Sequence, residues 1–168
     1  MKNFYISSLL LLLGLFVFAS CGLHRSKASY NQSFDEIENS ILVQNQNPNF
    51  PLPEIPESIV DGQDRAIYLS KYYWKEFPFD DVSLINKSEV TEQAFVDYIH
   101  VINFIPFKHA RRSIKYLFVL AKKDKDMYGH FASLFEKYYY NADSPFRNEE
   151  LYIPVLETIL KSDMLSDE

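Results

Sequence analysis

The sequence has little of the material from which catalytic sites are built. Cys21 is its one cysteine, and it contains only four glycines. Dithiol redox chemistry needs a second thiol at Cys-x-x-Cys spacing, because that thiol must reach the mixed disulfide formed by the first. Glycine-rich phosphate loops and Gly-x-Ser-x-Gly turns are also absent. These 168 residues therefore cannot perform dithiol chemistry by themselves, and they carry no signature of nucleotide or acyl-transfer chemistry.

Metal-binding signatures are missing as well. The four histidines do not occur at the paired spacing of metal ligands. Asp124-Lys125-Asp126 begins like a calcium loop but lacks the glycine and the distal glutamate, so helix capping explains it better. We predict no catalytic, metal-binding or cofactor-binding residues, and we expect that the protein is not an enzyme.

The chain also lacks an excess of positive charge, because 23 acidic residues outnumber 17 lysines and arginines, for a net charge of −6. Such a chain has no overall positive field with which to neutralise phosphates, so we predict no nucleic-acid partner. What it has in abundance is aromatic residues, at 16% of the total. Their apolar area lets a small domain fold without disulfides.

The one long apolar run lies at the N-terminus, where Lys2 precedes residues 4–18 and Ala19-Ser20-Cys21 follows them. This arrangement resembles the lipobox of bacterial lipoproteins, in which small residues precede a cysteine that is acylated before the signal is removed. Spanning a membrane takes about 20 apolar residues, and this run is shorter and interrupted by serines. We therefore predict a signal peptide over residues 1–20 and lipidation of Cys21.

Two alternatives to lipidation are an uncleaved membrane anchor and an ordinary secretory signal, which would leave an unpaired thiol in an oxidising compartment. The lipoprotein interpretation places the protein in the bacterial cell envelope, anchored to a membrane by its lipid. Gly22 is not an acidic inner-membrane retention residue, which favours the outer membrane, facing the periplasm.

Composition divides the rest of the chain into a tether and a domain. Residues 21–48 are polar apart from a patch whose spacing suits a short amphipathic helix, and we interpret them as a flexible tether spanning roughly 30 Å. The prolines of residues 50–56 exclude helix, so this segment is predicted to be an extended lead-in strand that packs on the domain through its apolar residues. The domain itself is assigned to residues 49–165.

Apolar residues at helical spacing predict an all-α domain, a compact bundle of four to five antiparallel helices. The expected ranges are 64–77, 89–104, a helix from Pro106 to Lys122-Lys123, 125–140, and a last helix opened by Glu149 and Glu150. Individual expectations are that Ser88 caps the second helix, that Phe107 and Tyr138 point inward, and that Pro154 kinks or restarts the last helix. Its inner face is assigned to Leu156, Ile159 and Leu160.

Two sets of residues are candidates for an interaction surface. The third helix is basic, through Lys108, Arg111, Arg112 and Lys115, and such a face suits an acidic partner or phospholipid headgroups, although a solvated helix face is the commoner use. Tyr72-Tyr73-Trp74 and Tyr138-Tyr139-Tyr140 surround their helices with rings, so some lie outside the core stripe. We name Tyr72, Trp74, Tyr139 and Tyr140 as surface candidates, although helix packing is the interpretation we favour for these clusters.

Several motifs carry a family resemblance: Phe50-Pro51-Leu52-Pro53-Glu54-Ile55-Pro56, the Arg65 to Trp74 helix, Glu92-Gln93-Ala94-Phe95, and above all residues 141–152. Together they resemble a helical domain of unknown function, the family numbered 5106, over about residues 49–165. The resemblance implies a lipoprotein of Gram-negative bacteria, of which many carry a thioredoxin-like domain directly after this region. The sequence stops at Glu168, and redox activity is not carried over because its residues are absent here.

The most specific motif has a structural interpretation. Arg147 lies near Asp143, Glu149 and Glu150, and ion pairs among them are expected to lock the turn before the last helix.

Two functional hypotheses follow. One is a membrane-anchored envelope lipoprotein with a non-catalytic helical binding or spacer domain, whose partner is an envelope protein, plausibly a thioredoxin-like one. The alternative is the N-terminal portion of a thiol-disulfide oxidoreductase lipoprotein whose catalytic domain is absent from this chain. An open reading frame beyond the Glu168 codon that encodes Cys-x-x-Cys would favour the second.

Overall fold

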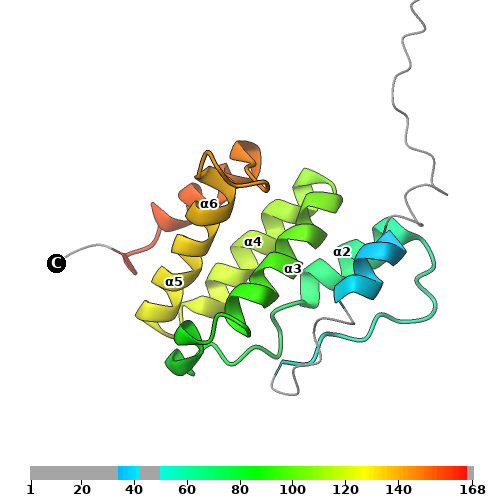
Figure 1. Cartoon of the computed structure of the whole chain (residues 1–168), viewed down its shortest axis with the longest axis horizontal. Coiled ribbons are helices and arrows are strands. Elements are labelled where there is room, and N and C mark those ends of the chain that lie inside the picture. The colour runs from blue at the N-terminus through cyan, green and yellow to red at the C-terminus, as the bar shows by residue number, and fades with distance from the viewer. Residues whose placement is uncertain (1–33, 42–49, 166–168) are drawn as a thin grey trace, which may run out of the picture.

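The computed structural model describes residues 34–41 and 50–165, and over these residues it confirms the predicted all-α fold (Figure 1). A helix over residues 34–41 comes first. It is followed by α2 (Gly62–Tyr72), the 3-10 turn η1 (Val82–Asn86), α3 (Thr91–Phe104), α4 (Phe107–Ala121), α5 (Lys125–Phe135), the π-helical segment η2 (Glu136–Tyr140) and α6 (Glu149–Ile159). The described residues contain no β-strand.

Helices α2, α3 and α4 pack on one another, α5 packs on α4, and α6 packs against α4 and α5 (Figure 1). The starts of three helices are fixed by side-chain caps. Asp61 accepts hydrogen bonds from the amides of residues 63 and 64, Asp124 from those of 126 and 127, and Asn148 from that of Leu151. The predicted cap Ser88 is wrong: α3 begins after Val90 without a side-chain cap, and Ser88 contributes only its backbone carbonyl.

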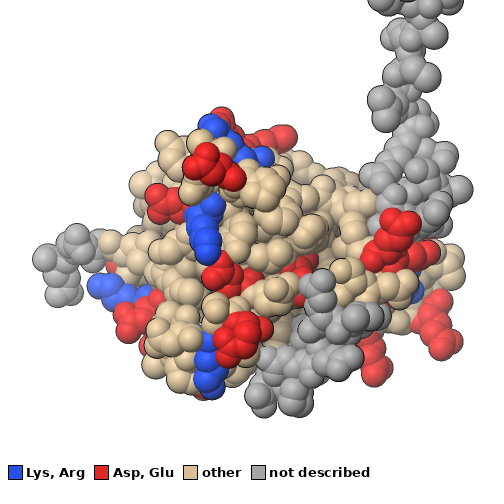
Figure 2. Space-filling view, viewed as in Figure 1, with Lys and Arg blue, Asp and Glu red and all other residues tan. Residues whose placement is uncertain are grey.

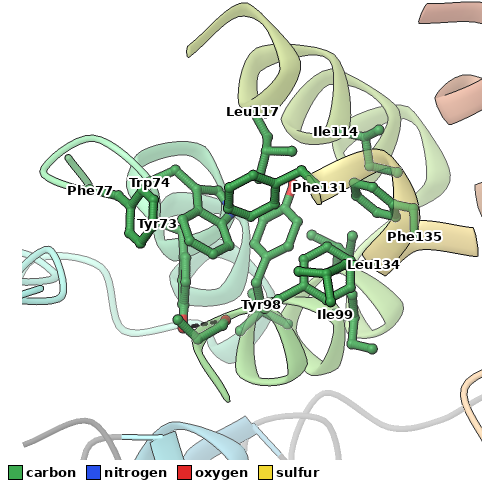
Figure 3. Close-up of a cluster of buried hydrophobic side chains, with 14 of the residues drawn as sticks. Tyr73, Trp74, Phe77, Tyr98, Ile99, Ile114, Leu117, Phe131, Leu134 and Phe135 are labelled. Carbon is green, nitrogen blue, oxygen red and sulfur yellow. Dashed lines mark hydrogen bonds between the residues drawn. The ribbon is translucent and has the colours of Figure 1, made fainter. Parts of the chain in front are cut away.

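Aromatic side chains fill the core where α2, α3 and α5 meet (Figure 3). Trp74, 2% exposed, is central to this aromatic cluster. Its ring centroid lies 5.1 Å from that of Phe131, 5.2 Å from that of Phe77 and 5.4 Å from that of Tyr98. Edge-to-face geometry dominates these contacts, which is the arrangement that ring quadrupoles favour.

The proline-rich lead-in packs on the domain, as predicted. Phe50 is 1% exposed and stacks on Trp74 at 5.5 Å between ring centroids. Leu52 and Ile55 are partly buried against the same core. Residues 51–56 adopt neither helix nor sheet strand. Their apolar side chains therefore extend the aromatic cluster without adding a further helix to the bundle.

The packed part of the chain begins earlier than the predicted boundary at residue 49. Residues 34–41, assigned to the tether by composition, are helical, and both Phe34 and Ile41 are buried in the common core. The guanidinium of Arg65 holds this helix on α2, donating to both carboxylate oxygens of Glu38 at 3.1 and 2.5 Å. A short amphipathic helix in a polar segment is thus stabilised by tertiary contacts that composition does not report.

The π-helical turn after α5 changes which tyrosine points inward. Tyr139 is fully buried, whereas Tyr138, predicted to face the core, is only partly buried. The wider π turn shifts the inward position by one residue relative to a regular α-helix. Phe107, also predicted to point inward, is 40% exposed because it occupies the first turn of α4.

The last helix also differs from expectation. It runs through Pro154 without a fresh start, and Leu151, Pro154 and Val155 form its buried face. Of the predicted inner face, Ile159 is partly buried against the core, but Leu156 is 42% exposed and Leu160 is 83% exposed. The fully buried positions of the helix therefore lie nearer its N-terminus.

The turn between η2 and α6 is held by backbone and hydroxyl contacts rather than by ion pairs. Ser144 Oγ donates to the carbonyl of Tyr138 at 2.6 Å, and the amide of Asn148 donates to the carbonyl of Tyr139 at 3.0 Å. Arg147 pairs with Glu149 alone among its predicted partners, and both side chains are exposed. The predicted network with Asp143 and Glu150 is therefore wrong.

These contacts predict the cost of two substitutions in the turn. Ser144→Ala should lower the free energy of unfolding by about 1 kcal/mol, because it leaves a half-buried carbonyl without its donor. Arg147→Ala should cost less than about 0.5 kcal/mol, since exposed ion pairs contribute little. Denaturant titration followed by circular dichroism measures both. A larger loss for Arg147→Ala than for Ser144→Ala would contradict this account of the turn.

Candidate functional site

The four residues of the predicted basic surface do not share one environment in the structure. Arg111 and Lys115 point to α6, where they pair with Glu157 at 2.7 and 3.4 Å. These ion pairs lower the pKa of the Glu157 carboxyl and link the two helices. Lys108 and Arg112 are exposed on α4. Of the four candidates on this helix, two thus take part in helix packing and two remain available at the surface.

The predicted aromatic surface is corrected at two of its four positions. Trp74 and Tyr139 are 2% and 0% exposed, so neither belongs to an interaction surface. Tyr140 is 56% exposed and stacks on Tyr152 at 5.4 Å between ring centroids. Tyr72 is partly buried, with its ring 4.7 Å from that of Tyr68. Tyr72 and Tyr140 lie on different elements and do not form one patch.

An open groove between α2 and α4 brings Tyr72 and Arg112 together. Its volume is ≈ 600 Å³, within the range of ligand sites in proteins. Helix α2 contributes Ile67, Ser70, Lys71 and Tyr72, and α4 contributes His109, Arg112, Ser113 and Tyr116. We call this site the α2–α4 groove.

The floor of the groove is fixed by buried hydrogen bonds. Ser113 Oγ donates to the carbonyl of Ser70 at 2.6 Å, joining α4 to α2. The hydroxyl of Tyr98 lies 2.7 Å from Ser113 Oγ and completes the chain. Burial raises the pKa of Tyr98 far above neutrality, so this hydroxyl stays protonated. These hydrogen bonds fix the position of α4 relative to α2 at the floor of the groove.

The walls of the groove are cationic and aromatic, and none of the described residues that line it is acidic. Lys71 Nζ lies 4.7 Å from the centroid of the Tyr72 ring, a cation–π contact. The neighbouring Tyr72 side chain raises the pKa of Lys71, which is charged at neutral pH. Arg112 supplies a second charge, and Tyr116, 43% exposed, an apolar surface. Such walls suit an acidic segment that also carries an apolar side chain.

Sequence reasoning found Tyr72 and Arg112 but missed Lys71, His109 and Tyr116. The signal was present as spacing: positions 109, 112, 113 and 116 share one face of α4, and 67, 70 and 71 share one face of α2. The sequence alone does not indicate that these faces of α2 and α4 meet.

The described residues show neither a metal centre nor a membrane-spanning helix. Over 34–41 and 50–165, no three His, Cys, Asp or Glu side chains converge as metal ligands would. No helix in this part of the chain has the length and apolar character needed to cross a membrane. Cys21, the predicted lipidation site, lies outside the described residues.

The fold and the groove define an all-α domain with an open cationic surface site. The family model "Domain of unknown function (DUF5106)" matches residues 22–168, and the chain belongs to this family. The matched range includes the helix over residues 34–41 that packs on the domain. No curated protein matches the chain.

A solved structure is also similar, the crystal structure of a thioredoxin-like protein from Bacteroides caccae. The two share 40% sequence identity, and the TM-score is 0.68. The similarity covers 72% of this chain and 44% of that protein, so the chain spans less than half of its length. The helical domain is therefore found in a thioredoxin-like protein, as the family resemblance implied.

Proposed function

We propose that this protein is a lipoprotein of the bacterial cell envelope whose helical domain binds a protein partner and performs no catalysis. Cys21 carries the lipid that anchors the chain to the outer membrane, and the domain faces the periplasm. The α2–α4 groove receives an acidic segment of the partner. The groove carries the proposal, because it concentrates Lys71, His109 and Arg112 without an acidic residue in a chain of net charge −6.

The partner we propose is a thioredoxin-like envelope protein. Its support is the thioredoxin-like protein from Bacteroides caccae, more than half of which lies outside the similar region. The same observation supports the second candidate function, in which this chain is the N-terminal portion of a thiol-disulfide oxidoreductase lipoprotein. In both cases the purified 168-residue chain should show no disulfide reductase activity, because it has one cysteine.

Site-specific photocrosslinking tests the groove. A photoreactive phenylalanine in place of Tyr116 should capture a thioredoxin-like protein in intact cells. Arg112→Glu should reduce the capture at least about tenfold, which corresponds to about 1.4 kcal/mol of binding free energy. The charge reversal acts because it places an acid where the partner's acid binds.

Two matched controls accompany this experiment. The same photoreactive residue at Tyr140, exposed but outside the groove, should not capture the partner. Arg147→Glu reverses an exposed charge elsewhere and should leave the capture from position 116 unchanged. If the Arg112→Glu variant still captured the partner, the groove would not be the site at which the partner binds.

Lipid anchoring has a separate test. Cys21→Ser should abolish acyl labelling of the protein and release it from the membrane fraction, because serine offers no thiol for acylation. Labelling with an alkyne fatty acid and fractionation of cells measure both effects. A variant that keeps its label and its membrane partition would refute the anchoring of this chain through Cys21.

A further inference from the structure

Helix α3 carries a buried carboxylate that the packing of the domain does not use. Asp97 is 4% exposed, and its Oδ1 accepts a hydrogen bond from Gln93 Nε2 at 3.0 Å. Its Oδ2 is buried and has no hydrogen-bond partner among the residues that the structure describes. Buried polar atoms in proteins nearly always have a partner, so this oxygen needs an explanation.

Asp97 lines a cavity of ≈ 400 Å³ between α3 and the helix over residues 34–41. Glu36 lines it from the opposite helix, and Ile37, Ile41 and Val96 provide apolar walls. The face drawn in Figure 2 shows mostly acidic side chains around this end of the molecule. The cavity thus combines an unpaired buried acceptor, a second carboxylate and apolar surface.

The titratable side chains that face Asp97 are either negatively charged or neutral. Glu36 comes from the helix over residues 34–41, and His100 comes from α3 itself. Burial lowers the pKa of His100, which is therefore uncharged at neutral pH. Tyr73, directly after α2, is also neutral, because burial and the nearby Asp97 raise the pKa of its hydroxyl. Burial raises the pKa of Asp97 to about 6, and none of the causes of that shift is a cation.

The side chains that line the cavity suit an organic cation better than a metal ion. Over the described residues no three His, Cys, Asp or Glu side chains are placed to hold a metal. An ammonium or guanidinium group needs only acceptor oxygens, and its alkyl chain needs apolar walls. The cavity has the volume of a small-ligand site and supplies both.

We propose that this cavity binds an organic cation, an alkyl ammonium or alkyl guanidinium group that pairs with the carboxylate of Asp97. Glu36 provides a second negative charge, and the alkyl chain lies against Ile37, Ile41 and Val96. Because the cavity is formed by two helices, the bound cation joins the helix over residues 34–41 to α3. The site is separate from the α2–α4 groove and does not depend on the function proposed for it.

Butylguanidinium and its neutral analogue butylurea test the proposal, with the full-length protein in detergent and calorimetry as the readout. Butylguanidinium should bind saturably, and butylurea at least tenfold more weakly. Binding of the cation should weaken as the pH falls from 7 to 5, because protonation removes the charge of Asp97. Asp97→Asn should weaken binding at least tenfold, whereas the exposed control Asp143→Asn should not.

A second variant separates loss of the site from loss of the fold. Val96→Phe narrows the cavity but keeps Asp97, and it should also prevent binding while the circular dichroism spectrum stays helical. Equal binding of butylurea, or unchanged affinity in Asp97→Asn, would overturn the proposal, as would the absence of saturable binding. The peptide acetyl-Gly-Gly-Arg-Gly-Gly-amide distinguishes the sources: tighter binding than butylguanidinium assigns the site to a protein side chain, and equal or weaker binding assigns it to a small free organic cation.

Discussion

Replacing Trp74 with alanine is expected to lower the free energy of unfolding by about 3–5 kcal/mol, the usual cost of removing a large buried aromatic side chain. The indole contacts rings from the lead-in, α3 and α5, including Phe50, Tyr98 and Phe131. Its loss would leave a cavity that rigid rings fill poorly. Denaturant titration followed by circular dichroism measures the change, with cooperative unfolding as the condition for the comparison.

Tyr140→Ala is the matched control for this prediction. Tyr140 is also an aromatic residue with a stacked neighbour, but it is 56% exposed. Its removal should cost less than about 1 kcal/mol, because little surface is taken from or returned to water. Similar losses for Trp74→Ala and Tyr140→Ala would show that the aromatic cluster is not the principal core.

Replacing Glu38 with alanine is expected to release the helix over residues 34–41 from the domain. The substitution leaves the Arg65 guanidinium largely buried, and among the described residues its remaining acceptor is the carbonyl of Ile59 at 3.1 Å. Hydrogen bonds to charged groups contribute about 1.5–3 kcal/mol, so docking of this helix should weaken by about 2 kcal/mol. Amide hydrogen exchange of residues 34–41 measures this local opening directly.

Asn39→Ala serves as the control, because Asn39 lies on the same helix and is exposed. It should leave the exchange protection of residues 34–41 unchanged, while residues of α5 should keep their protection in both variants. If Glu38→Ala left the exchange of this helix unaltered, the pair with Arg65 would not be what holds it.

Periodicity predicted the helices well where one face is continuously apolar. For α4, the stripe through Ala110, Ile114 and Leu117 is buried as expected. Prediction failed where the helix is not regular or where packing decides the face. The π turn moved the inward position from Tyr138 to Tyr139, and the packing of α6 on the bundle buries Val155 while leaving Leu156 exposed. Neither event has a signature in residue spacing.

The candidate site was predictable only in part for the same reason. Composition indicated that α4 is basic, but it did not distinguish Arg112, which lines the groove, from Arg111, which pairs with Glu157. The two residues are adjacent in sequence and about 100° apart around the helix. Their roles depend on which neighbouring helix lies on each side, and that is a property of the tertiary fold.

The position of Trp74 has a practical consequence, since it is the one tryptophan in the chain. An indole enclosed by rings, with its Nε1 donor unpaired and shielded from water, should emit at short wavelength. The 12 tyrosines of the chain will transfer excitation energy to this single acceptor. Fluorescence excited at the long-wavelength edge of the absorption band, where tyrosine does not absorb, therefore reports on the aromatic cluster alone. Tryptophan emission therefore measures the packing of the core directly. Ligands that bind at the surface will leave this emission unchanged.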